Sequence, residues 1–112
     1  VYLLGFYDTT AAVTFLRKYD VDGNVIASRD IPVQESGQDG PSIAVDRDDN
    51  VIVALSFYGG SANGRDARVD KHDSDLTVLW SYSYNNAGAD EYVNAVTTNA
   101  QGEAVYEYRA ST

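Results

Sequence analysis

The chain repeats part of its own sequence at a spacing of 53 residues, and this periodicity limits its possible folds more than any other feature. A shift of 53 positions aligns residues 15–59 with residues 68–112 without a gap, and all five identities fall between positions 18 and 28. The identical pairs are Lys18/Lys71, Asp20/Asp73, Asp22/Asp75, Val25/Val78 and Ser28/Ser81. Conservative pairs extend this register, namely Ile26/Leu79, Ile43/Val96, Asp46/Asn99 and Ile52/Val105. The repeat predicts that one supersecondary unit is built more than once.

Short runs of β-branched, apolar and aromatic residues are separated by Gly, Asn, Asp and Ser, which is the pattern of strands joined by turns. The predicted strands are residues 1–7, 13–19, 25–31, 42–46, 51–57, 67–72, 77–84, 92–98 and 104–109. Residues 22–24, 48–50 and 101–102 have the Asp, Asn and Gly composition of tight hairpins. No window carries apolar residues at helical spacing over three turns, so we predict an all-β fold.

Composition excludes several classes of protein. A chain of 112 residues makes one small domain, and its net charge of −9 opposes binding to nucleic acid. The sequence has no cysteine, which removes disulfides and cysteine-ligated metals, and we expect no cofactor. Its apolar runs are far shorter than the roughly 20 residues that span a bilayer, so no membrane insertion is expected. Val1 is not an initiator Met, and we expect a mature or excised piece.

Three stretches resemble a known repeat family. They are IAVDRDDNVIVA at 43–54, GRDARVDKHDSDLTVLWS at 64–81 and GADEYVNAVTTNAQGEAVY at 88–106. Together they are similar to the bacterial β-propeller repeat often called SBBP, which combines a K-x-D strand end, a strand ending in Trp-Ser and an AVDxxGNVYV hairpin. Two positions depart from this pattern. Asp49 stands where the family has Gly, and Ala27 stands where the second copy has Trp80.

The resemblance implies β-propeller blades, which are four-stranded antiparallel sheets with strands A to D from the inside outward. Residues 1–31 then form a partial blade with strands B, C and D, residues 42–84 a complete blade, and residues 92–109 a partial blade with strands A and B. The chain supplies about two blades, fewer than the roughly four to eight of a closed ring. We therefore expect a homo-oligomer or completion by other blades of a parent protein. Comparing the ends places Val1 and Tyr2 at the blade positions of Val105 and Tyr106.

Two Asp/Asn clusters have the alternating oxygen ligands of a calcium loop. They are Asp20, Asp22 and Asn24, and Asp46, Asp48 and Asn50. Neither continues to the Gly and distal Glu of that loop, and local turn hydrogen bonds explain both, so we favour turns and expect no metal. The same interpretation as a solvated corner is preferred for Asp70, His72, Asp73 and Asp75.

The sequence carries no arrangement typical of a catalytic centre. His72 is its only histidine, and no GxSxG motif surrounds a serine. Gly59, Gly60 and Gly64 resemble a phosphate-binding loop but lack the lysine and the following helix, so they predict a loop between strands. We expect no enzyme activity from this chain alone.

Aromatic residues offer the remaining candidate site. Trp80, Tyr82 and Tyr84 alternate along one predicted strand and share a face, as do Tyr106 and Tyr108. We expect core packing, with Trp80 buried between adjacent sheets. The alternative is an exposed platform that stacks on sugar rings.

Three functional interpretations follow. The first is a non-enzymatic binding or scaffold module of a secreted or cell-surface bacterial protein, a location that the resemblance implies, with a protein or carbohydrate ligand. The second is part of a propeller enzyme or lectin that acts on or binds polysaccharide. The third is a β-sandwich of nine strands, which the 53-residue register disfavours.

Overall fold

The computed structural model describes residues 1–7, 13–31, 42–58, 65–84 and 90–111, and this part of the chain is all-β without a helix. The all-β prediction is therefore confirmed. The nine strands are β1 Tyr2–Tyr7, β2 Val13–Tyr19, β3 Val25–Ile31, β4 Ser42–Val45, β5 Val51–Tyr58, β6 Arg65–His72, β7 Val78–Tyr84, β8 Asp90–Thr98 and β9 Ala104–Ser111. Each predicted strand is present, with shifts of one or two residues at several ends.

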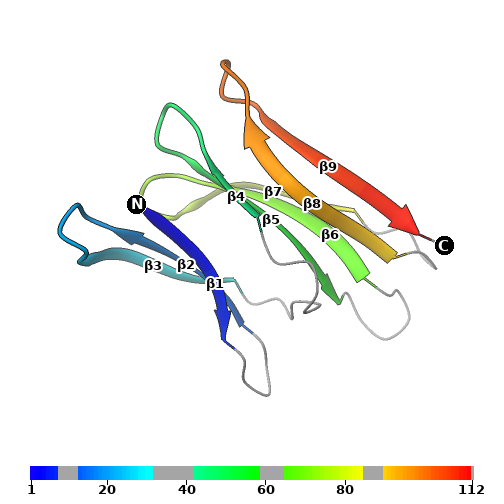
Figure 1. The fold of residues 1–112 in the computed structure, drawn as a ribbon, viewed down its shortest axis with the longest axis horizontal. Helices are drawn as coiled ribbons and strands as arrows, with labels where there is room; N and C mark the ends of the chain where they lie inside the picture. The colour runs from blue at the N-terminus through cyan, green and yellow to red at the C-terminus, as the bar shows by residue number, and fades with distance from the viewer. Residues whose placement is uncertain (8–12, 32–41, 59–64, 85–89, 112) are drawn as a thin grey trace.

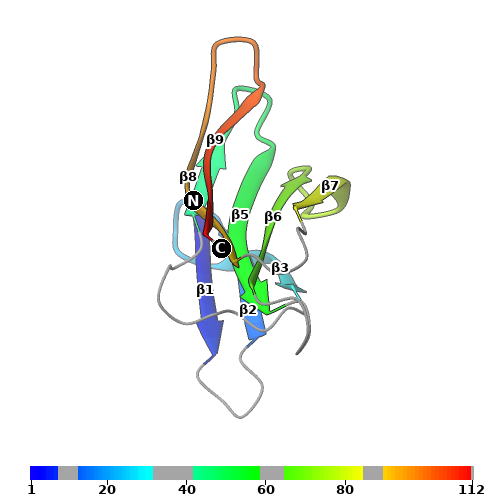
Figure 2. The same ribbon diagram turned by 90° about the vertical axis from the view of Figure 1, so that its right-hand side faces the viewer.

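The strands form three antiparallel sheets in chain order. Sheet A has the order β1-β2-β3, sheet B the order β4-β5-β6-β7 and sheet C the order β8-β9. Figure 1 shows the three sheets following one another across the molecule, with the N-terminus on sheet A and the C-terminus on sheet C. Figure 2, turned by 90°, shows β5 beside β8 and β9, and the apolar cores on both faces of β5 make sheet B the middle layer.

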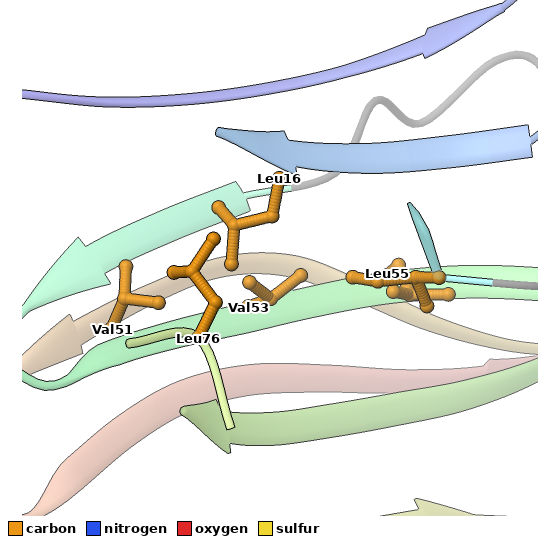
Figure 3. Close-up of a cluster of buried hydrophobic side chains, with 6 residues drawn as sticks. Leu16, Val51, Val53, Leu55 and Leu76 are labelled. Carbon is orange, nitrogen blue, oxygen red and sulfur yellow. The ribbon is translucent and has the colours of Figure 1, made fainter. Parts of the chain in front are cut away.

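Two apolar cores hold the three sheets together, one on each face of β5. Val51, Val53 and Leu55 point toward sheet A, where Leu16 and Ile31 meet them (Figure 3). The intervening residues of β5 point the other way, because successive side chains of a strand alternate between its faces. This second core consists of Ile52, Ala54, Ala67 and Val69 from sheet B with Val93 and Val96 from sheet C.

Polar contacts tie sheet B to sheet C beside this second core. The pairing of β8 with β9 shifts between Val93 and Ala95, and the backbone nitrogens around this bulge donate to serines of sheet B. Val93 N donates to Ser56 Oγ at 3.1 Å, and Val96 N donates to Ser42 Oγ at 3.2 Å. The two serines thus satisfy backbone donors that the bulge directs toward sheet B.

Four hairpins share one five-residue turn. In each turn the first residue, Asp20, Asp46, Asp73 or Asn99, accepts hydrogen bonds from the backbone nitrogens two and four residues later. The fourth residue of each turn has a positive φ, at Gly23, Asp49, Leu76 and Gly102. Asp49 has a φ of 62°, in the left-handed region that Asp tolerates.

The structure corrects the predicted equivalence of the chain ends. Tyr2 pairs with Lys18, whereas Lys71, which lies 53 residues after Lys18, pairs with Ile52. Tyr2 therefore matches Ile52 and, one repeat later, Val105, so the prediction that matched Tyr2 to Tyr106 is wrong by one residue. The error arose because the first strand lies outside the ungapped alignment, where only the pairing fixes the register.

Candidate binding groove

The turn between β6 and β7 fastens sheet B to sheet A. Leu76 lies at the left-handed position of this turn with φ 65° and is only 2% exposed, packed among the apolar residues of the first core. Figure 3 shows its side chain between Leu16 of β2 and Val51 and Val53 of β5. A branched apolar residue in a strained backbone position is held by its surroundings, so the contact with sheet A must stabilise the turn.

Two cations of sheet A fix the backbone of the same turn. Lys18 Nζ donates to the Ser74 carbonyl at 3.3 Å and to Asp49 Oδ2 at 3.0 Å, and Arg29 Nη1 donates to the Leu76 carbonyl at 3.3 Å. Tyr2 reinforces the arrangement, since its hydroxyl donates to Asp49 Oδ1 at 3.0 Å. The hydrogen bond to Asp49 raises the pKa of Lys18, and the same contact lowers the pKa of Asp49.

The equivalent place between sheets B and C is an open groove of about 580 Å³. The residues that line each wall of this groove correspond to residues of the filled interface 53 positions earlier. Lys71 corresponds to Lys18, and Trp80 and Tyr82 correspond to Ala27 and Arg29. On the other wall, Gly102, Ala104 and Tyr106 of sheet C correspond to Asp49, Val51 and Val53. The groove therefore has the outline of the filled interface without the turn that occupies it.

Trp80 and Tyr82 lie at the mouth of this groove, with 40% and 53% of their surfaces exposed. The prediction that Trp80 is buried between adjacent sheets is wrong for this chain. The physical reason is that, among the described residues, sheet C consists of β8 and β9, and neither of these strands covers Trp80 on β7. Of the predicted aromatic residues, Tyr84 and Tyr106 pack against the second core.

Tyr82 and Tyr106 line the groove, and Tyr84 packs beside both rings. The ring centroids of Tyr82 and Tyr84 are 4.8 Å apart in an edge-to-face arrangement, and those of Tyr84 and Tyr106 are 6.3 Å apart. The hydroxyls of Tyr84 and Tyr106 share a hydrogen bond of 3.2 Å, which with partial burial raises the pKa of Tyr106 to about 12. The raised pKa keeps the Tyr106 hydroxyl protonated at physiological pH, and the three rings form one aromatic cluster beside the groove.

Lys71 forms the polar end of the groove and is held by Asp46. The Lys71 Nζ to Asp46 Oδ2 distance is 3.1 Å, and the Asp46 side chain is almost completely buried. Burial alone would raise the pKa of Asp46. The hydrogen bonds from the Asn50 backbone and side chain, and from Lys71, outweigh burial and lower this pKa to about 2. Lys71 is therefore oriented by a carboxylate that stays ionised.

The predicted Asp/Asn clusters are the turns described above. Asp20 Oδ1 accepts from the Asp22 and Asn24 backbone nitrogens, and Asn24 Nδ2 donates to Asp20 Oδ2. The cluster at Asp46, Asp48 and Asn50 repeats these three contacts. The carboxylates thus satisfy backbone donors, as the turn interpretation expects, and within the described ranges no three metal-ligating side chains are grouped.

The cluster around His72 is divided between two environments. Asp70 and His72 are fully buried on the face of β6 toward sheet A, whereas Asp73 and Asp75 belong to the exposed turn. Asp70 accepts hydrogen bonds from Arg68 Nε at 2.8 Å and from the Ser81 hydroxyl. Burial lowers the pKa of His72, although the nearby Asp70 opposes this shift. The four residues do not converge on one site.

Sequence reasoning found Trp80, Tyr82 and Tyr106 but missed Leu76 and the smaller sheet C residues of the groove, Gly102 and Ala104. The signal for Leu76 was an apolar residue at the turn position that Gly23 occupies one repeat earlier. Gly59, Gly60 and Gly64, predicted to form a loop, lie outside the described residues, as does the side chain of Tyr108.

No family model matches this sequence, and no curated protein is similar to it. In the described part of the chain, no helix could cross a membrane.

Proposed function

We propose that this chain is a segment of a β-propeller that serves as a non-enzymatic binding or scaffold module. The observation that carries the proposal is the repetition of one sheet-to-sheet interface at an offset of 53 residues. Lys18 and Lys71, and the turns at Asp49 and Gly102, occupy matching places in the first and second interfaces. Stacked antiparallel sheets with a repeated interface are the arrangement that propellers build by radial repetition.

The order of the sheets supports this proposal further. Within the described residues, sheet B has four strands, no strand pairs with the free edge of β1 in sheet A, and none pairs with the free edge of β9 in sheet C. Both incomplete sheets expose apolar side chains, including Leu3 and Ile26 on sheet A and Val105 on sheet C. Such surfaces favour association, so the segment works with further blades, from copies of itself or from a parent protein. The SBBP resemblance favours a secreted or cell-surface bacterial protein.

A carbohydrate-binding role is the second candidate. It is favoured by the exposed rings of Trp80 and Tyr82, since an aromatic face next to a groove is the usual platform for a sugar ring. Titration with soluble oligosaccharides tests this role, because Trp80 is the only tryptophan and its emission reports directly on the groove. A reducing-end assay on the same samples separates binding from cleavage by a propeller enzyme.

The propeller proposal is tested by completing sheet C within one chain. Val105 lies 103 positions after Tyr2, and Thr112 lies 103 positions after Thr9. A second copy of residues 10–31, appended directly after Thr112, therefore keeps the strand register of the first copy. They would supply a second β2–β3 hairpin next to β9. We expect slow amide exchange in the appended hairpin and a higher melting temperature than that of the unextended chain.

The control is the same extension with its residues in scrambled order. If the ordered extension exchanges as fast as the scrambled one and gives no gain in melting temperature, sheet C is not an incomplete blade. The sandwich interpretation would then be preferred.

A further inference from the structure

We propose that the groove beside Trp80 is the docking site for the β2–β3 turn, residues 20–24, of a second copy of this chain. In this arrangement the partner's β2–β3 hairpin completes sheet C, with β9 in the place that β1 holds in the isolated chain. The inference rests on the proposed function, and it adds which segment fills the groove.

The filled interface between sheets A and B supplies the template. There the β6–β7 turn of sheet B occupies the groove, with Leu76 at its centre. This turn joins the third and fourth strands of sheet B. The β2–β3 turn is the same element one repeat earlier, since Asp20 and Asp73 make the same backbone contacts 53 residues apart. In the described chain it is the only other turn that follows a strand aligned with β6 at the offset of 53.

Side-chain sizes in the two grooves are complementary. Leu76 fills the first groove, where the small Ala27 packs against the same apolar cluster. In the second groove the residue equivalent to Ala27 is Trp80, and the turn residue equivalent to Leu76 is Gly23. In the first groove a large turn residue, Leu76, is combined with a small wall residue, Ala27. In the second groove a small turn residue, Gly23, would be combined with a large wall residue, Trp80. Such exchanges of volume preserve packing between facing surfaces.

The backbone of the turn is also suited to the groove. Lys18 donates to the carbonyl of Ser74 in the template, so Lys71 would donate to the carbonyl of the equivalent residue, Val21. Lys71 has donors to spare beside its contact with Asp46, as Lys18 has beside Asp49. Val21 is 99% exposed in the isolated chain and would gain cover at the groove.

In the isolated chain no neighbouring atom requires a glycine at position 23, and only its φ of 86° favours one. A Cβ added there has no neighbour within 4 Å, and the equivalent residue Leu76 holds a similar φ with a large side chain. A side chain at position 23 therefore meets no steric obstacle in the separate molecule, and its only cost there is the backbone strain of the positive φ. It collides only when the turn lies against Trp80.

The test measures association of the whole chain by sedimentation velocity and Trp80 emission over a wide range of concentration. We expect the mass to rise with concentration and the emission of Trp80 to move to shorter wavelength in step. Gly23→Leu should weaken association by about ten- to a hundredfold, because the added side chain overpacks the groove. Gly23→Leu combined with Trp80→Ala recreates the Leu76/Ala27 pairing and should recover most of the lost affinity.

The matched control is Asp22→Leu, which places the same side chain at the position just before Gly23 in the turn. Its equivalent Asp75 stays exposed when the template groove is filled, so this variant should associate like the original chain. Melting followed by circular dichroism confirms that each variant is folded.

Three results would overturn the inference. They are a folded chain that stays monomeric, association without a change in Trp80 emission, and equal effects of Gly23→Leu and Asp22→Leu. An oligosaccharide that shifts Trp80 emission while the chain stays monomeric would assign the groove to a sugar instead. None of these results bears on whether the extended chain completes sheet C, so the two proposals fail separately.

Discussion

Asp46 shows at the scale of one residue how a buried carboxylate stabilises a hairpin and orients Lys71. Its pKa is about 2 in the folded chain against 3.8 for an ordinary aspartate, so the unfolded chain binds more protons between these values. The stabilisation by this carboxylate is therefore fully present above about pH 4. It is lost as the pH falls toward about 2.

We predict that Asp46→Asn lowers the free energy of unfolding by about 1 to 2 kcal/mol at neutral pH, and that this difference disappears near pH 2. Asparagine keeps the backbone contacts of the turn, as Asn99 does in the β8–β9 hairpin, but loses the ion pair with Lys71. Urea unfolding at a series of pH values measures the effect. A constant difference across this range would mean that the carboxylate charge contributes nothing.

Asp46→Ala is the companion variant. It removes the acceptor from the Asp48 and Asn50 backbone nitrogens, so it should be less stable than Asp46→Asn at every pH.

At the scale of the element, the β6–β7 turn joins sheets A and B through Leu76. We predict that Leu76→Ala costs about 2 to 5 kcal/mol of stability, the usual range for truncating a buried leucine. Leu79→Ala is the matched control, since Leu79 lies three residues later and is 51% exposed, and its cost should stay within about 0.5 kcal/mol. Denaturant unfolding of both variants decides, and equal costs would show that Leu76 does not lock the interface.

The strands and turns could be predicted from the sequence because each depends on neighbouring residues. Alternating apolar runs identified β5 and β6, and the Asp and Asn residues marked the hairpins that close around Asp20 and Asp46. The exposure of Trp80 could not be predicted in this way. It depends on which strands lie opposite β7, and no local pattern states how the described sheets pack against each other.

Leu76 escaped prediction for a related reason. A turn residue with a positive φ is ordinarily Gly, Asn or Asp, so the turn chemistry at this position is unfavourable by itself. Packing between two sheets that are distant in sequence overrides the local preference, and only the comparison with Gly23 gives a hint of it.

At the scale of the whole molecule, association must overcome charge repulsion, because each copy carries a net charge of −9. We predict that raising the ionic strength strengthens self-association, since salt screens the repulsion between copies while apolar contacts in the groove persist. Sedimentation at low and at physiological salt measures this dependence. Weaker association at higher salt would show instead that ion pairs between copies dominate.

The central claim is that the three sheets are blades of an incomplete propeller. Each copy would supply sheet B and share one composite sheet with its neighbour, so two, three or four copies would close rings of about four, six or eight blades. Electron microscopy of the associated chain tests this most directly. The account predicts rings of uniform size with a central channel and an even number of lobes, whereas filled particles without a channel would contradict it.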